Sequence, residues 1–249
     1  MGATVSADPI RIAAVGDVHL GEDLRGRYRP VVEELADRAD VLLVAGDLTQ
    51  HGTVDEAAVV ADELGGAPVP VVAVLGNHDY HSGAEGSITW LLEDAGIQVL
   101  EASATVLDTP AGTLGIAGAK GFCLGFSGRC ASDFGEPEMR AFTRHGIRSA
   151  EGLRQAFDGL EADVRVALTH FAPVDSTLHG EPVEIWPFLG NYLLGDVVDD
   201  VGADLAVHGH AHAGTEKGLT ADGRPVRNVA QPVIRAAYRI YEVFPGGTP

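Results

Sequence analysis

The sequence predicts an α/β fold whose parallel strands carry a polar site at their carboxyl ends. Short apolar runs alternate with helical segments over residues 10–100, and the connections between them are short. Strand, helix and strand joined in this way form parallel βαβ units, whose helices cover the faces of a sheet. Five apolar runs of the chain end in Asp, Asn or His. Ligands of open α/β sheets bind outside the carboxyl ends of the strands, so these endings predict one shared site.

Four strands and three helices are predicted in the amino-terminal half. Each strand is a short apolar run, and each helix has apolar side chains at helical spacing. Glycines follow the second and third helices, where glycine is the usual stop signal. The strands span residues 10–15, 41–45, 69–75 and 97–100, and the helices span residues 29–38, 53–64 and 87–95.

The carboxyl-terminal half predicts hairpins as well as βαβ units. Strands at 104–108 and 113–118 flank a Thr-Pro-Ala-Gly turn, and Asp222-Gly223 marks a second hairpin turn. Two segments without a regular period, 120–135 and 173–187, are predicted long loops. The remaining elements are helices at 149–160 and 188–201 and strands at 164–169, 205–207, 215–219, 226–229 and 236–243.

Length and composition indicate a single domain over residues 1–249. Hydrophobic residues make up 45% of the 249, enough to bury a full core. Residues 1–9 carry neither a basic nor an apolar targeting pattern, and no apolar run approaches the roughly 18 residues of a membrane span. We therefore expect a cytoplasmic location and no membrane partner. Cys123 and Cys130 have the spacing of neither a disulfide framework nor a Cys-x-x-Cys pair, so both are interpreted as reduced thiols without an assigned role.

The formal charge of −19, from 17 basic and 36 acidic residues, disfavours nucleic acid as a partner. A surface that binds long nucleic acid is normally basic. Phosphate chemistry remains compatible with this charge, because bound divalent cations invert the potential of an acidic site.

Polar side chains follow the five apolar strands at their carboxyl ends. Any one of them alone is typical of a turn that caps the next helix. Together they are carboxylates, imidazoles and one amide, with no thiolate, and such ligands suit Mn, Fe or Zn ions. The residues are Asp17, His19, Asp47, Asn77, His78, Asp79, His170, His210 and His212. Their order along the chain therefore predicts a metal site at the edge of the sheet.

The five endings, taken in order, resemble the five motifs of the calcineurin-like metallophosphoesterases. The resemblance covers about residues 10–230 and is carried by Asp17-x-His19, Gly46-Asp47, Gly76-Asn77-His78-Asp79, His170 and Gly209-His210-x-His212. It implies the fold of that family, an α/β sandwich of two mixed β-sheets flanked by helices. This fold agrees with the βαβ half and the hairpin-rich half described above.

The resemblance implies a centre of two divalent metal ions bridged by Asp47. The two oxygens of a carboxylate can hold cations ~3.5–4 Å apart, the separation of two-metal phosphoryl-transfer sites. A metal-bridging hydroxide would attack phosphorus in line, and Mn, Fe and Zn all remain candidates for the metals. One ion is assigned to Asp17, His19, Asp47 and His212, and the other to Asp47, Asn77, His170 and His210.

His78 and Asp79 are implied to be catalytic residues instead of metal ligands. In the family the corresponding histidine lies beside the phosphate, where it stabilises charge or protonates the leaving oxygen. Asp79 is expected to orient the ring of His78. His208, which precedes the last motif, is interpreted as a hydrogen-bonded core or supporting residue.

Departures from subfamily patterns favour a phosphodiesterase. The residues after Asp47 match neither the protein Ser/Thr phosphatases nor the purple acid phosphatases, whose tyrosine ligand would stand where this chain has Gln50. The Gly-Asp-Leu-Thr form resembles bacterial phosphodiesterases. We therefore predict metal-dependent hydrolysis of a phosphodiester of a small organic phosphate or nucleotide, with that small phosphoester as the partner.

Two alternatives stay open. A nuclease of the same family would act on DNA or RNA, although the acidic balance disfavours it. A catalytically weak, metal-binding interaction scaffold is the alternative from another class. Such a scaffold is expected to lack the bridging Asp or the His after Asn, and this chain keeps Asp47 and His78. The oligomeric state is not predicted.

Specificity is expected to lie in two loop regions, residues 120–148 and 173–187. The first carries arginines that form either a solvated face or a clamp for a substrate phosphate. The second carries His179, which could overhang the site. The arginines are Arg129, Arg140, Arg144 and Arg148.

Overall fold

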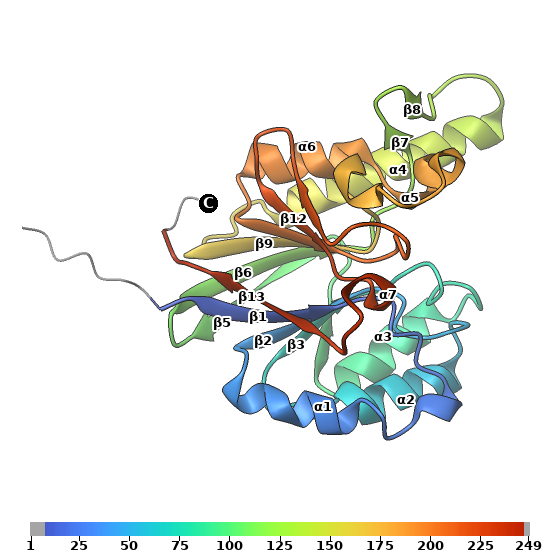
Figure 1. Cartoon of the computed structure of the whole chain (residues 1–249). Helices are drawn as coiled ribbons and strands as arrows, with labels where there is room; N and C mark the ends of the chain where they lie inside the picture. The colour runs from blue at the N-terminus through green and yellow to red at the C-terminus, as the bar shows by residue number, and fades with distance from the viewer. Residues whose placement is uncertain (1–7, 247–249) are drawn as a thin grey trace, which may run out of the picture.

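Two β-sheets face each other at the centre of the molecule, and helices cover the outer face of each sheet (Figure 1). The structure is a computed structural model that describes residues 8–246. Residues 1–7, which form most of the amino-terminal segment considered for targeting, lie outside the described part. The predicted sandwich of two mixed sheets flanked by helices is confirmed.

The first sheet contains the βαβ units of the amino-terminal half, in the strand order β13-β1-β2-β3-β4. Its parallel strands are β1 (Ile10–Val15), β2 (Val41–Ala45), β3 (Val71–Val74) and β4 (Ile97–Val99), and β13 (Arg239–Val243) pairs antiparallel with β1. Its outer face is covered by α1 (Arg29–Glu33), α2 (Val54–Leu64) and α3 (Glu85–Asp94). Short 3-10 turns, Glu22–Leu24 and Glu34–Asp37, flank α1. Thr53 starts α2 through a capping box with Glu56, which satisfies two backbone N–H groups.

The second sheet has the order β11-β12-β10-β9-β6-β5. Its strands are β5 (Ser103–Thr109), β6 (Gly112–Ala119), β9 (Val164–Thr169), β10 (Leu205–His208), β11 (Lys217–Leu219) and β12 (Pro225–Asn228). Its four inner strands are parallel, and hairpins add an antiparallel strand at each edge. It is covered by α4 (Pro137–Ala156) and α6 (Tyr192–Val201), and α7 (Gln231–Ile234) precedes β13. No helix in residues 8–246 has both the length and the apolar character of a membrane span.

Side chains of the second sheet alternate between two cores. Ile116 and Val166 belong to the cluster that fills the space between the sheets, whereas Ala117 and Ala167 belong to the cluster beneath α4 and α6. Successive side chains of a strand point to opposite faces. The large residues of these strands therefore point between the sheets, and the small ones point toward the helices. The alanines allow the helices to lie close to the sheet.

The clearest differences from the predicted elements lie in the carboxyl-terminal half. α4 begins at Pro137 instead of residue 149, because its first half buries few apolar side chains that could show a helical period. The predicted helix 188–201 is divided into α5 (Trp186–Leu189) and α6, and Asn191 caps α6 by accepting the N–H of Leu193 at 3.0 Å. The predicted loops contain a small hairpin, β7 (Gly125–Phe126) and β8 (Arg129–Cys130), and the 3-10 turns Asp175–Leu178 and Val183–Ile185.

Candidate metal centre

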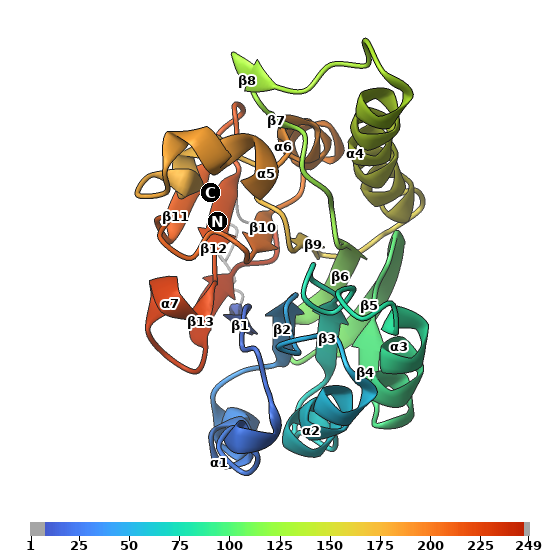
Figure 2. The ribbon, with the colours of Figure 1, turned by 90° about the vertical axis from the view of Figure 1, so that its right-hand side faces the viewer.

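The carboxyl ends of both sheets meet at one edge of the molecule, which Figure 2 views end-on. Residues after β1, β2 and β3 reach this edge from the first sheet, and residues after β9 and β10 reach it from the second. Three sets of donor atoms form there, and the atoms of each set lie within 4.8 Å of one another. The sets are Asp17, His19 and His212; His19, Asp47 and His78; and Asp47, His170 and His210.

Left-handed backbone conformations direct four of these side chains. The φ angles of Asp17, His19, Asp47 and His210 are 58°, 43°, 51° and 68°. Non-glycine residues in this region carry a strain of order 1–3 kcal/mol each, which the surrounding structure must offset. Hydrogen bonds between the turns do this: Asp17 N–H donates to the Gly46 carbonyl at 2.9 Å, and His19 N–H donates to the Asp47 carbonyl at 3.0 Å.

Two glycines permit the close approach of backbone to the carboxylates. A Cβ atom on Gly76 would lie 2.1 Å from Asp47 Oδ1, and a Cβ atom on Gly209 would lie 2.4 Å from Asp17 Oδ2. No side chain fits at such distances. The glycines of the third and fifth motifs are therefore required by the packing of the carboxylates.

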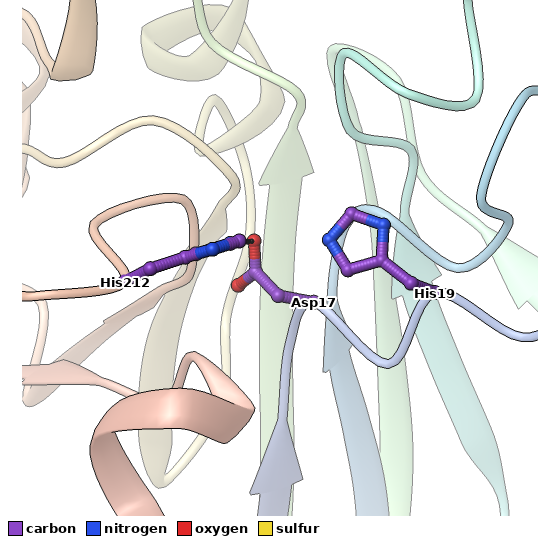
Figure 3. Close-up of side chains that lie close together, drawn as sticks. All are labelled: Asp17, His19 and His212. Carbon is purple, nitrogen blue, oxygen red and sulfur yellow. Dashed lines mark hydrogen bonds and ion pairs between the residues drawn. The ribbon is translucent and has the colours of Figure 1, made fainter.

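Asp17 lies between His212 and His19, which come from different sheets (Figure 3). Its Oδ1 is 2.8 Å from His212 Nε2, and its Oδ2 accepts the backbone N–H of His210 at 2.9 Å. On the other side, His19 Nε2 lies 3.7 Å from Asp47 Oδ2.

Asp47 also faces a second set of donors. Its Oδ1 lies 3.4 Å from His170 Nε2, and that nitrogen lies 2.9 Å from Asn77 Oδ1. His170 Nδ1 is 2.9 Å from the Ala45 carbonyl, and His210 Nε2 is 3.2 Å from the Phe188 carbonyl. A carbonyl accepts a ring N–H, so the other nitrogen of each ring, Nε2 of His170 and Nδ1 of His210, keeps a free lone pair. That of His170 lies beside Asp47.

Burial sets the protonation states of the site. It lowers the pKa of both His170 and His210 to about 3, so both rings are neutral at neutral pH. Burial also raises the pKa of Asp17 to about 6, against the lowering effect of the His212 hydrogen bond. His170 and His210 are therefore in the neutral form that binds metals, whereas the hydrogen bond with Asp17 raises the pKa of His212.

Divalent cations fit this donor set. His19 Nε2 is buried and has no hydrogen-bond partner, a desolvated state that a ligand would relieve. Asp47 turns Oδ2 toward His19 and Oδ1 toward His170, so its two oxygens face two separate sets. Oxygen and imidazole ligands without thiolate match Mn, Fe or Zn.

His78 lies at the open side of the site. Its Nδ1 is 2.7 Å from the Gln50 carbonyl, and its Nε2 is 3.9 Å from Asp47 Oδ2. Its ring contacts that of His19 with centroids 4.5 Å apart. With Nδ1–H donated to the carbonyl, Nε2 is the nitrogen that faces the cluster.

The expectation that Asp79 orients the ring of His78 is wrong. The buried Asp79 carboxylate accepts the backbone N–H groups of Thr49 at 2.8 Å and Gly76 at 2.7 Å, and the Thr49 hydroxyl at 2.6 Å. The turn after Asn77 points neighbouring side chains in opposite directions, and the Gln50 carbonyl takes the place expected for Asp79. Asp79 instead ties the loop of Asp47 to the turn of Gly76.

Replacing Asp79 with Asn is therefore expected to destabilise the metal-free protein by about 2–3 kcal/mol, since an amide N–H would face backbone donors. Calorimetry should show a Tm lower by roughly 5–10 °C. The control is Asp163→Asn, because exposed Asp163 accepts the same two groups from Thr113, both at 2.8 Å, and its loss should leave Tm nearly unchanged. An unchanged Tm for Asp79→Asn would contradict the conclusion that Asp79 ties the loop of Asp47 to the turn of Gly76.

The other sequence candidates lie away from the donor sets. His208 is buried, with Nδ1 2.7 Å from the Gly209 carbonyl and Nε2 2.9 Å from the Thr177 hydroxyl. Arg129 stacks on Trp186 at 5.1 Å, and Arg144 pairs with Asp133 at 3.0 Å. The rings of His179 and Trp186 lie 5.9 Å apart in the second loop region.

Lys120 is a residue of this edge that sequence reasoning missed. It directly follows β6, and its carbonyl accepts the N–H of His170 at 2.9 Å. The predicted strand 113–118 stops one residue before the true end of β6 at Ala119. With the correct end, Lys120 would have been recognised as the polar residue that follows an inner strand.

Comparisons with known proteins identify a family for this chain and solved structures with a similar fold. The family model described as calcineurin-like phosphoesterase matches residues 10–214, whereas no curated protein sequence matches the chain. The solved structure of phosphopantetheinyl hydrolase from Mycobacterium tuberculosis is similar, with a TM-score of 0.68 and 17% identity over 98% of this chain and 100% of that one. TT1561 from Thermus thermophilus has a TM-score of 0.55 and 14% identity over 94% and 99% of the two chains. GAP50, the anchor in the inner membrane complex of Plasmodium, has a TM-score of 0.56 and 14% identity over 90% of this chain and 72% of that one. At these identities the solved structures establish the fold.

Proposed function

The chain belongs to the calcineurin-like phosphoesterase family, and from this premise we propose that it hydrolyses a phosphodiester of a small organic phosphate or nucleotide. The observation that carries the proposal is the position of Asp47, whose two oxygens face two separate sets of imidazole donors. One set would be completed by Asp17, His19 and His212, and the other by Asn77, His170 and His210. When bound, two divalent cations would neutralise phosphate charge and acidify a water molecule.

His78 is proposed to act on the substrate through Nε2. The Gln50 carbonyl holds Nδ1–H at 2.7 Å, so the ring orientation is set before the substrate arrives. The side chain remains 44% exposed, which leaves Nε2 accessible to a bound ester. In the doubly protonated ring, Nε2–H can donate a hydrogen bond to a phosphate oxygen or its proton to the leaving oxygen.

An apolar hollow beside the centre supports an ester with an organic group. It has a volume of about 840 Å³ and is lined by Leu124, Met139, Phe142 and Phe188 among other apolar residues, together with Arg129 and Glu138. Phe188 also forms part of the metal site, because its carbonyl lies 3.2 Å from His210 Nε2. Pockets of this size and apolar character are typical of small-molecule sites. An ester bound at the cations could thus place one alcohol group in the hollow.

A charge added to the apolar wall of the hollow should weaken the binding of esters with a large apolar group more than that of esters with a small one. We expect Met139→Glu to raise KM roughly 10-fold for phenyl p-nitrophenyl phosphate and to leave KM for methyl p-nitrophenyl phosphate nearly unchanged. Both esters release the same p-nitrophenolate, so chemistry at the leaving group is matched. Leu219→Glu, at an exposed apolar residue on β11, is the control. An equal rise in KM for both esters would remove the hollow from the substrate site.

The proposed function is tested with protein loaded separately with Mn, Fe or Zn. Metal content is measured first, and then hydrolysis of monoester and diester chromogens, cyclic nucleotides and single-stranded DNA is compared. We expect about two ions per chain and the highest kcat/KM with a small diester. A chain that retains fewer than about one ion would contradict the dinuclear centre, and preferred cleavage of DNA would favour a nuclease.

A further inference from the structure

Lys120 places a cation at the border of the metal centre. Its backbone carbonyl accepts the N–H groups of His170 at 2.9 Å and Phe171 at 3.2 Å, so the residue is attached to the β9 strand end. Phe171, the residue after His170, also contacts the ammonium group, with its ring centroid 5.3 Å from Nζ. The ammonium group is therefore held beside a strand end that carries a proposed metal ligand.

Three aromatic rings surround the ammonium. Lys120 Nζ lies 4.8 Å from the ring centroid of Tyr80, 5.4 Å from that of Phe122 and 5.3 Å from that of Phe171. Aromatic faces attract a cation through their quadrupoles, but they do not accept its N–H groups as a carboxylate does. The rings therefore hold the ammonium in place without neutralising it.

The ammonium group has more N–H donors than the hydrogen bonds it makes to the described part of the chain. Nζ donates to the Gly121 carbonyl at 3.2 Å, and an ammonium has three N–H donors. Glu101 accepts the backbone N–H of Lys120 at 3.2 Å, not the ammonium. Within residues 8–246, no carboxylate forms an ion pair with Nζ. Burial lowers the pKa of Lys120, and the charges of Glu101 and Asp47 act in the opposite direction.

Two rings of the cage lie beside residues proposed as metal ligands. Tyr80 is in the turn of Asn77, with its N–H 3.3 Å from the Asn77 carbonyl. The ring of Phe171 lies 4.4 Å from that of His210. Two of the three rings are thus in the turns that carry proposed metal ligands, and the ammonium borders the second donor set.

We propose that Lys120 binds an anionic oxygen of the substrate. The inference rests on the proposed phosphoester hydrolysis and adds a positioning cation to it. The oxygen belongs either to the reacting phosphate or to a second anionic group of the substrate, and both have the same chemistry toward an ammonium. In a chain with a net charge of −19, such a cation favours substrates that carry more negative charge.

The test compares inhibition by inorganic phosphate and by methylenediphosphonate, which carries a second anionic group. The proteins are the zinc-loaded wild type, Lys120→Met and Lys120→Arg, assayed with a diester chromogen after metal analysis. For Lys120→Met we expect about a 10-fold or greater rise in the inhibition constant of the diphosphonate, with substantial recovery in Lys120→Arg. An equal rise for phosphate assigns Lys120 to the reacting phosphate, whereas an unchanged value for phosphate assigns it to the second group.

The matched control is Lys217→Met, because Lys120 and Lys217 are the lysines of the chain and Lys217 is exposed on β11. If Lys120→Met lowers Tm but leaves both inhibition constants unchanged, Lys120 only supports the aromatic rings and the proposal fails. Absence of turnover or of bound zinc in the wild type would instead contradict the proposed function.

A direct measurement does not depend on the stability of Lys120→Met. Reductive methylation with carbon-13 labels both lysines and the α-amino group of the zinc-loaded wild type. The resonance missing from Lys120→Arg is that of Lys120, and the one missing from Lys217→Met is that of Lys217. Titration with methylenediphosphonate should move the Lys120 resonance to saturation and leave that of Lys217 in place. A stationary Lys120 resonance under saturating inhibition would refute the contact.

Discussion

Replacing Asp47 with Asn is expected to lower kcat/KM for a phosphodiester by roughly 10³-fold and to reduce bound metal from two ions to one or fewer. The two Asp47 oxygens face His19 and His170 at 3.7 and 3.4 Å, so one substitution affects both donor sets. Asparagine keeps the size of the side chain but loses its charge and one oxygen. Metal analysis and steady-state kinetics on the loaded proteins measure the two effects together.

Asp40→Asn is the matched control for this experiment. Asp40 directly precedes β2, whereas Asp47 follows the same strand, so the two carboxylates lie at opposite edges of the sheet. Asp40 pairs with Arg11 at 2.8 Å, and its loss should leave metal content and kcat/KM nearly unchanged. Retention of two ions by Asp47→Asn would show that Asp47 does not join the two sets.

The second large effect is expected for His78→Ala, with kcat lower by roughly 10²–10⁴-fold while two ions remain bound. The ring is held by the Gln50 carbonyl at 2.7 Å, and its Nε2 faces the metal site, 3.9 Å from Asp47 Oδ2. If Nε2 protonates the leaving oxygen, the loss should be smaller for p-nitrophenolate, a good leaving group, than for an alkoxide. Kinetics with a p-nitrophenyl ester and with a dialkyl ester measure this difference.

His81→Ala tests whether the effect is specific to His78, because His81 is an exposed histidine of the same turn. Its activity and metal content should match those of the wild type. Loss of one ion from His78→Ala would make His78 a ligand, since its Nε2 lies with His19 and Asp47 in one set of donor atoms. Full activity with intact metal content would exclude its catalytic role.

The sequence predicted the bounds of those elements whose structure depends on residues adjacent along the chain. β1, β2 and β9 have the predicted bounds, because each is a continuous apolar run that ends at a polar residue. α4 was predicted too short because its first half packs few apolar side chains, so no helical period marks it. Asp79 was misplaced for a related reason. The spacing of Asn77, His78 and Asp79 does not reveal the direction in which a turn points each side chain.

The sequence by itself determined the α/β class, the order of the motifs and the kinds of ligand atom at the strand ends, because these follow from apolar periods and residue types. Only the tertiary structure decided which of these atoms meet. His212 reaches Asp17 across a separation of 195 residues. The carbonyls of Ala45 and Gln50 orient His170 and His78, and Lys120 contacts the rings of the distant residues Tyr80 and Phe171. Such contacts depend on the packing of two sheets against each other and on left-handed turns at Asp17, His19, Asp47 and His210. Neither leaves a periodic trace in the sequence, since both arise from long-range contacts.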